Sequence, residues 1–219
     1  PWNTALTPGG SSGGSSAALS ACMLPLVTAS DGGGSTRIPA SFVGAFGLKP
    51  TFGRIPNESK SLWSYGDTAV QGPLTKTVAD NALYLDVTSG YSPEDPSSLP
   101  HPGFSYRTKL ADGVPRKLRI AYSPDLGYAV VQSDIAQAVY DAAKLYERLG
   151  HELVEIKGGP PKMGQAWGMW GAFELAAAAV HDEPGGLAVA VVAHQVHALL
   201  EELLLKAVDG FVLGGEFAG

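Results

Sequence analysis

Two clusters of glycine and serine, at residues 7–16 and 30–37, constrain most strongly what this 219-residue chain can fold into. Glycine has no Cβ, so it adopts positive φ values readily and lets backbone N–H groups approach a ligand closely. Ser11 and Ser35 each follow glycines within one of the clusters. The pattern favours two tight loops that could hold an oxyanion.

The segment between the clusters predicts how the two serines come together. Ser15–Cys22 consists of small residues and predicts a short helix, and Leu26–Ser30 predicts a buried strand. A helix followed by a strand returns the chain toward its start. We therefore expect the hydroxyls of Ser11 and Ser35 to lie within hydrogen-bonding reach.

The two clusters also form one long motif. They read GGSSGGS at residues 9–15 and DGGGSTRIPA at residues 31–40. At this spacing they resemble the amidase signature family, serine hydrolases of amides with a Ser-cisSer-Lys triad. The resemblance continues through GLKPTFGR at residues 47–54 and QGPLTKTVAD at residues 71–80, weakens over residues 118–155 and then fades. A motif of this length has little chance of arising at random.

The resemblance implies a fold and a domain organisation. It predicts an α/β fold with a mixed, largely parallel sheet covered by helices on both faces, present here in incomplete form. Residues 1–175 are expected to be part of one amidase signature domain. Residues 176–219 are rich in Ala, Val and Leu and no longer look like the family. We interpret them as a divergent or truncated C-terminal segment rather than an independent domain.

Hydrolysis of an amide needs a nucleophile, a base that later protonates the leaving amine, and donors for the tetrahedral oxyanion. The resemblance implies that Ser35 is the nucleophile, that Ser11 relays its proton, and that the Gly10–Ser11 peptide bond is cis. It assigns the base to a lysine some tens of residues before the relay serine. Only ten residues precede Ser11, so we expect this lysine to be missing from the chain.

The residues around Ser35 are expected to stabilise charge and to support the loop. The oxyanion hole would use the backbone N–H groups of Gly32, Gly33, Gly34 and Ser35. Asp31 and Arg37 flank these residues and are interpreted as braces that act through hydrogen bonds and an ion pair. A solvated surface pair is the alternative for them. Ser12, beside the relay serine, is assigned a supporting role.

Three other interpretations of the serine loops are open but less favoured. Flexible Gly/Ser linkers are disfavoured because apolar segments bracket both loops. Residues 9–13 satisfy G-x-S-x-G, but the nucleophile elbow of an α/β-hydrolase needs a strand immediately before it, and residues 1–8 do not predict one. A phosphate-binding loop would continue with Gly-Lys-Ser/Thr, which is absent from the sequence here.

Composition narrows the choice of partners. The net charge of −6, with no basic run, argues against nucleic acid or an anionic membrane and favours a small-molecule amide substrate. The single cysteine, Cys22, cannot form an intrachain disulfide, which fits a cytoplasmic location. The apolar segment at residues 187–208 contains histidines and glutamates and is not interpreted as transmembrane. No metal or organic cofactor is expected.

The chain begins at Pro1, without Met or a signal peptide, so we expect it to be an internal fragment. A missing N-terminal segment would leave apolar surface uncovered, and a homo-oligomer is therefore compatible with the sequence.

The remaining sequence predicts scaffold elements. Leu48–Gln71 is expected to be a long irregular connection, Thr77 to begin a helix through a capping box, and Tyr91–Pro115 to be a connector. Leu118–Glu155 predicts a strand, a helix that ends at Gly150, and a second strand that runs parallel to the first.

Two further groups of side chains leave alternatives open. Met163, Trp167, Trp170 and Phe173 predict an aromatic helix that belongs to the core or, less favoured, to a substrate wall. His194, His197 and Glu201 could face one side of a helix as a metal triad, but an ordinary amphipathic face is favoured.

The sequence thus predicts an amidase that hydrolyses a carbon–nitrogen amide bond through a Ser35 acyl-enzyme, with Ser11 as proton relay. Two alternatives stay open: an inactive amidase fragment, and an amidotransferase A-type subunit. Ile38 and the triple glycine before Ser35 resemble free-standing amidases more than the amidotransferase subunit.

Overall fold

The structure, a computed structural model, describes residues 3–57, 68–113 and 116–181. The exposure of the side chains is described as far as residue 172. The chain divides into two compact units, one of Pro1–Ala111 with Ala166–Gly219 and the other of Asp112–Gln165. The divergent or truncated C-terminal segment expected at residues 176–219 stays a prediction, because residues 182–219 lie outside the described part. The same holds for the proposed metal triad and for the apolar segment at residues 187–208.

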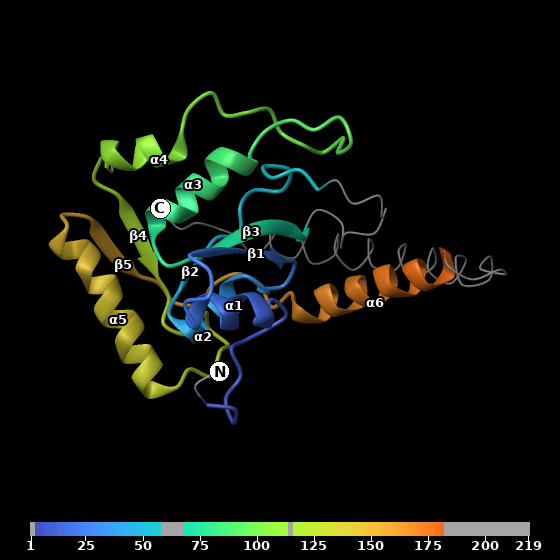
Figure 1. Ribbon diagram of the computed structural model, residues 1–219. Coiled ribbons are helices and arrows are strands. Elements are labelled where there is room, and N and C mark those ends of the chain that lie inside the picture. Colours follow the sequence, from blue (N-terminus) through green and yellow to red (C-terminus); the bar gives the residue numbers. More distant parts are fainter. Residues whose placement is uncertain (1–2, 58–67, 114–115, 182–219) are drawn as a thin grey trace, which may run out of the picture. The chain divides into compact units, whose positions relative to one another are not determined.

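The first unit contains a three-stranded sheet in the order β1-β3-β2 (Figure 1). Strand β1 (Leu26–Asp31) and strand β2 (Phe46–Gly47) both pair antiparallel with the central β3 (Val70–Thr75). The prediction of an α/β chain is confirmed, but a largely parallel sheet is wrong for this unit. Strands β1 and β2 do run in the same direction, yet the returning β3 lies between them.

Sequence reasoning missed β3 because its composition argues against a central strand. Proline cannot donate to a strand ladder, and Pro73 stands opposite Thr28 in the middle of the sheet. Gly72 precedes it, and a Cβ there would lie only 2.2 Å from the carbonyl oxygen of Leu48. The glycine is therefore required by the close approach of the chain at residue 48.

Helices lie on both sides of this sheet, as predicted (Figure 1). Helices α1 (Gly13–Ser20) and α2 (Arg37–Val43) lie on one side, and α3 (Val78–Thr88) lies on the other with the short α4 (Tyr106–Lys109). A 3₁₀ turn, η2, follows at Leu110–Asp112, and α6 spans Gly164–His181. The buried core consists of side chains from α1, β1, α2 and β3, namely Leu19, Val27, Ala29, Ala40 and Leu74.

The alternating burial of β1 positions the site. Val27, Ala29 and Asp31 are buried, whereas Thr28 and Ser30 are exposed. Successive side chains of a strand point to opposite faces, so Asp31 enters the buried side at the end of β1. The chain then forms a glycine loop and begins α2 at Arg37.

Two predicted elements of the sequence are confirmed in detail. The backbone N–H of Asp80 donates to Thr77 Oγ1 at 3.1 Å, which caps α3 as expected. In the second unit, β4 (Arg119–Tyr122) pairs parallel with β5 (Glu152–Glu155), and α5 (Ser133–Arg148) connects them. The expected connector at residues 91–115, by contrast, contains α4 and η2.

Candidate active site

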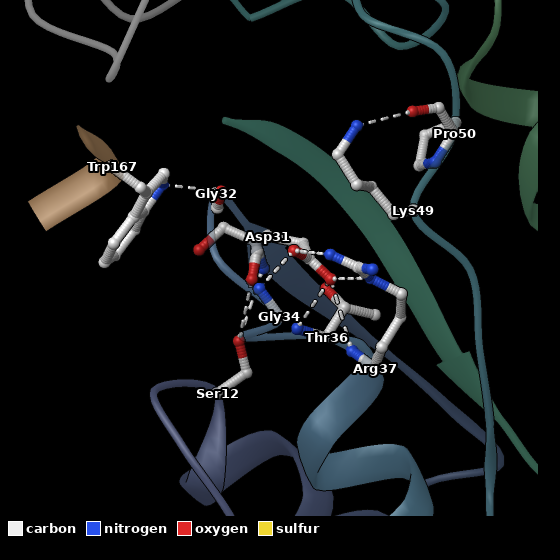
Figure 2. A network of polar contacts seen from close by, with 10 residues as sticks. Ser12, Asp31, Gly32, Gly34, Thr36, Arg37, Lys49, Pro50 and Trp167 are labelled. Carbon is white, nitrogen blue, oxygen red and sulfur yellow. Dashed lines mark hydrogen bonds and ion pairs between the residues drawn. The ribbon is translucent and has the colours of Figure 1, made fainter. Parts of the chain in front are cut away.

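The two serine loops lie next to each other in the first unit. The backbone N–H of Ser12 donates to the carbonyl oxygen of Ser35 at 3.4 Å. The Ser12 hydroxyl donates to the carbonyl oxygen of Ser30 at 3.4 Å and accepts from the backbone N–H of Ser30 at 3.3 Å (Figure 2). Ser12 thus joins the first loop both to the end of β1 and to the second loop.

The two predicted catalytic serines are accessible from outside. Ser11 is exposed and Ser35 is half-buried, and the Gly10–Ser11 peptide bond is cis. No hydrogen bond joins the two hydroxyls in the described part of the chain. The structure therefore brings the two loops together without the hydroxyl–hydroxyl hydrogen bond that the sequence led us to expect.

Asp31 organises the loop that carries Ser35 (Figure 2). Its Oδ1 accepts from the backbone N–H of Gly34 at 2.7 Å, and its Oδ2 accepts from the backbone N–H groups of Thr36 and Arg37, each at 3.3 Å. The Arg37 guanidinium adds two bonds of 2.9 Å, from Nε to Oδ2 and from Nη2 to Oδ1. The expected ion pair is present, and its acid is not a surface group, since the Asp31 side chain is 0% exposed.

This arrangement keeps the carboxyl of Asp31 ionised. Burial by itself raises the pKa of Asp31, but the hydrogen bonds from the Arg37 side chain and from the Gly34 and Arg37 backbone outweigh it. The pKa of Asp31 consequently lies below its ordinary value of 3.8. The hydrogen bond to Asp31 likewise raises the pKa of Arg37 above its ordinary value. At neutral pH a charged pair therefore fixes the loop.

The backbone N–H groups of the loop fall into two sets. The Gly34 N–H is used by Asp31, so in this structure it is a loop support and not a free oxyanion donor as predicted. The N–H groups of Gly32, Gly33 and Ser35 have no acceptor among the residues that the structure describes. Gly34 also has a φ of +113°, which a side chain rarely permits.

Trp167 of α6 lies against the same loop, and sequence reasoning did not assign it there. Its indole Nε1 donates to the carbonyl oxygen of Gly32 at 3.0 Å (Figure 2). A Cβ built on Gly33 would lie 2.6 Å from Trp167 Cζ2. The Trp167 residue is 42% exposed, so the favoured core interpretation is wrong for this residue. Helical periodicity placed it in an aromatic helix but carried no signal for this tertiary contact.

The charged groups near the site do not include an evident base for the serines among the described residues. Lys49 Nζ donates to the carbonyl oxygen of Pro50 at 3.4 Å, as suits a structural role (Figure 2).

Across the described residues, His, Cys, Asp and Glu form no cluster of three that could hold a metal ion. The described helices also include none with the length and apolarity needed to cross a bilayer.

A glycine loop carries the half-buried Ser35, and the loop of Ser11 and Ser12 lies beside it. The Amidase family profile matches residues 1–212. The chain belongs to this amidase family.

Similar proteins include enzymes with two different activities. An acylamidase of Rhodococcus erythropolis is 41% identical over 172 residues, which cover 78% of this chain and 36% of that protein. The A-type subunit of the glutamyl-tRNA(Gln) amidotransferase of Shouchella clausii is 41% identical over 157 residues, which cover 71% of this chain and 32% of that protein. The chain thus spans about a third of the length of the curated relatives that it matches.

Solved structures show the same two groups. A bacterial aryl acylamidase of the amidase signature family superposes with a TM-score of 0.74 at 28% identity, over 96% of this chain and 48% of that one. The A-type subunit of the glutamyl-tRNA(Gln) amidotransferase from Thermotoga maritima gives a TM-score of 0.73 at 28% identity, over 95% of this chain and 47% of that one.

Proposed function

We propose that the intact protein hydrolyses a carbon–nitrogen amide bond through an acyl-enzyme on Ser35. The arrangement of the Asp31–Arg37 loop is the observation that carries this proposal. The buried Asp31 carboxylate accepts hydrogen bonds from the backbone N–H groups of Gly34, Thr36 and Arg37. The N–H groups of Gly32, Gly33 and Ser35 remain for an oxyanion, as amide hydrolysis requires.

In the proposed reaction the Ser35 Oγ attacks the amide carbonyl carbon and forms a tetrahedral oxyanion. The Ser35 proton passes to Ser11, and the Ser11 proton passes to a neutral lysine that lies outside these 219 residues. Return of a proton to the amide nitrogen lets the C–N bond break and the amine leave. Water then attacks the ester carbonyl carbon, the bond between this carbon and Ser35 Oγ breaks, the carboxylic acid leaves, and a proton returns to Ser35 Oγ. No metal or organic cofactor takes part.

Supporting roles follow from the contacts. Asp31 and Arg37 hold the loop by their ion pair, and Ser12 bridges the two serine loops through Ser30. The N–H groups of Gly32 and Gly33 are the proposed oxyanion donors, with that of Ser35. The Gly34 N–H holds the loop in place through its hydrogen bond to Asp31. Loss of one oxyanion donor typically lowers kcat about a hundredfold to a thousandfold.

The test compares the protein with its Ser35→Ala variant in the hydrolysis of a simple aryl amide. We expect the variant to be inactive and to resist labelling by a fluorophosphonate, which reacts with activated serines. Ser41→Ala is the matched control, because Ser41 is an exposed serine of α2 whose hydroxyl donates to the carbonyl oxygen of Ile38 at 2.9 Å. Equal rates for Ser35→Ala and the parent would refute the proposal.

An A-type subunit of an amidotransferase is a second candidate, favoured by the matches to that subunit of the glutamyl-tRNA(Gln) amidotransferase. It predicts that hydrolysis depends on partner chains. Full activity of the isolated protein toward an aryl amide would exclude it. An inactive amidase that only binds its ligand predicts that parent and Ser35→Ala bind an amide equally and that neither hydrolyses it.

A further inference from the structure

We propose that Trp167 is a positioning residue that orients the Gly32–Gly33 peptide group so that the Gly33 N–H faces the substrate oxyanion. This inference rests on the proposed function. Its geometric basis is one hydrogen bond, from Trp167 Nε1 to the carbonyl oxygen of Gly32 at 3.0 Å. That carbonyl belongs to the same peptide group as the Gly33 N–H.

A peptide group is planar, so the direction of its carbonyl fixes the direction of its N–H. In the trans form the two bonds point to opposite sides. Gly10–Ser11 is the one cis bond found in the described residues, so the Gly32–Gly33 bond is trans. Trp167 binds the carbonyl side of this group and leaves the N–H on the other side without an acceptor in the described chain.

A lone Gly-Gly peptide would otherwise reorient easily, because neither residue has a Cβ. The indole restrains it in a second way. A Cβ on Gly33 would lie 2.6 Å from Cζ2 and 2.9 Å from Cη2 of Trp167. The six-membered ring therefore occupies the space beside Gly33 that any larger residue would need. Gly33 and Trp167 fit each other as a pair.

The decisive variant places 3-benzothienylalanine at position 167, because this analogue keeps the ring shape of tryptophan but lacks the N–H. Trp167→Phe is the simpler second variant. For both we expect kcat toward an aryl amide to fall about tenfold to a hundredfold, as for other small misplacements of catalytic groups, with KM almost unchanged. The loss should be the same for acetyl and for larger acyl groups. Affinity for a trifluoromethyl ketone, which forms the oxyanion on Ser35, should fall by the same factor.

A readout that is independent of catalysis is the amide ¹⁵N and ¹H shift of Gly33. We expect it to move in both variants and to stay unchanged in Gln165→Ala, a control at an exposed position of the same helix. The Cβ of Gly33→Ala would displace the indole, so Gly33→Ala and Trp167→Phe disturb the same contact. The fall in kcat of the double variant should therefore be smaller than the product of the two separate falls.

Two results would overturn the proposal: an unchanged Gly33 amide shift in both Trp167 variants, or a loss confined to KM that grows with acyl size. The second result would make Trp167 a substrate wall. Failure of the proposed function is distinguishable, because it would appear as activity in Ser35→Ala while the Gly33 shift still reports on the peptide group.

Discussion

The guanidinium of Arg37 binds both oxygens of the Asp31 carboxylate, with Nε 2.9 Å from Oδ2 and Nη2 2.9 Å from Oδ1. Asp31 is the last residue of β1 and Arg37 is the first of α2. The pair therefore closes the loop that connects strand to helix and that carries Ser35. A bidentate pair of this kind fixes the relative orientation of the two side chains and also contributes the attraction between their charges.

Loss of the Asp31 charge should destabilise the fold. Asp31→Asn leaves one acceptor oxygen where two now receive five hydrogen bonds. Since hydrogen bonds to charged groups each contribute about 1.5–3 kcal/mol, we expect the free energy of unfolding to fall by at least about that amount. Urea denaturation of the parent and of Asp31→Asn measures this difference in the free energy of unfolding. Asp141→Asn is the control, because Asp141 is exposed on α5 and contacts only Gln137 in the described hydrogen bonds. Equal stability of the two variants would contradict the bracing role of Asp31.

The stability of the protein should decline in acid. The pKa of Asp31 is below 3.8 in the folded state, because its hydrogen bonds outweigh the effect of burial. A group with a depressed folded pKa stabilises the fold above its unfolded pKa, and this contribution is lost as the pH falls through the folded pKa. Urea denaturation from about pH 6 to about pH 2.5 should therefore show a falling free energy of unfolding that begins near pH ~4, the ordinary pKa of an aspartate.

Asp86 and Asp95 contribute to the same decline, since their pKa values are also lowered. The Ser105 hydroxyl holds the pKa of Asp86 down; at Asp95 burial raises the pKa, but bonds from Ser97 and Asn57 outweigh it. Asp31→Asn should thus flatten the pH dependence only in part. An unchanged slope in that variant would show that Asp31 does not titrate differently in the folded and unfolded states.

Much of this fold could be predicted because its signals are local. The capping box at Thr77, the apolar alternation of β4 and β5, and the periodicity of α5 each depend on neighbours in sequence. The acid–base pair at Asp31 and Arg37 was likewise predictable, since the two residues bracket one short glycine loop.

What could not be predicted depends on contacts between distant segments. The use of the Gly34 N–H by Asp31 is a matter of loop conformation, and glycine permits many conformations. The place of Pro73 in a central strand contradicts strand propensity and is set by pairing with β1. Trp167 meets Gly32 across more than a hundred residues of chain, and no periodic pattern encodes such a contact.

The glycines of the loop should differ sharply in their tolerance of alanine. Gly34 has a φ of +113°, and a Cβ there would lie 2.7 Å from Ile38 Cδ1. The flexible Ile38 side chain could move, but the backbone angle stays unfavourable, so we expect Gly34→Ala to lower the free energy of unfolding by about 1–3 kcal/mol. A Cβ on Gly32 would meet Ala69 at an ordinary 3.5 Å, and Gly32→Ala should change stability by less than about 0.5 kcal/mol. Thermal melting compares them, and equal melting temperatures would contradict this interpretation of the loop.

Ser11 and Ser12 are neighbours with different proposed roles, which makes them a matched pair for mutation. Ser11 is exposed, and none of the hydrogen bonds of the described residues uses its side chain. Ser11→Ala should leave the melting temperature unchanged and lower kcat about a hundredfold to ten-thousandfold, as expected when proton transfer is lost. The fall arises because Ser35 then has no route to release its proton.

Ser12→Ala should show the reverse pattern. It removes two long hydrogen bonds to Ser30, of 3.4 and 3.3 Å, that join the serine loops. The expected loss is about 0.5–1.5 kcal/mol in the free energy of unfolding, with a much smaller fall in kcat than for Ser11→Ala. Steady-state kinetics and urea denaturation on both variants separate the roles. If Ser12→Ala lost activity as severely as Ser11→Ala while both stayed folded, the proton relay could not be assigned to Ser11 alone.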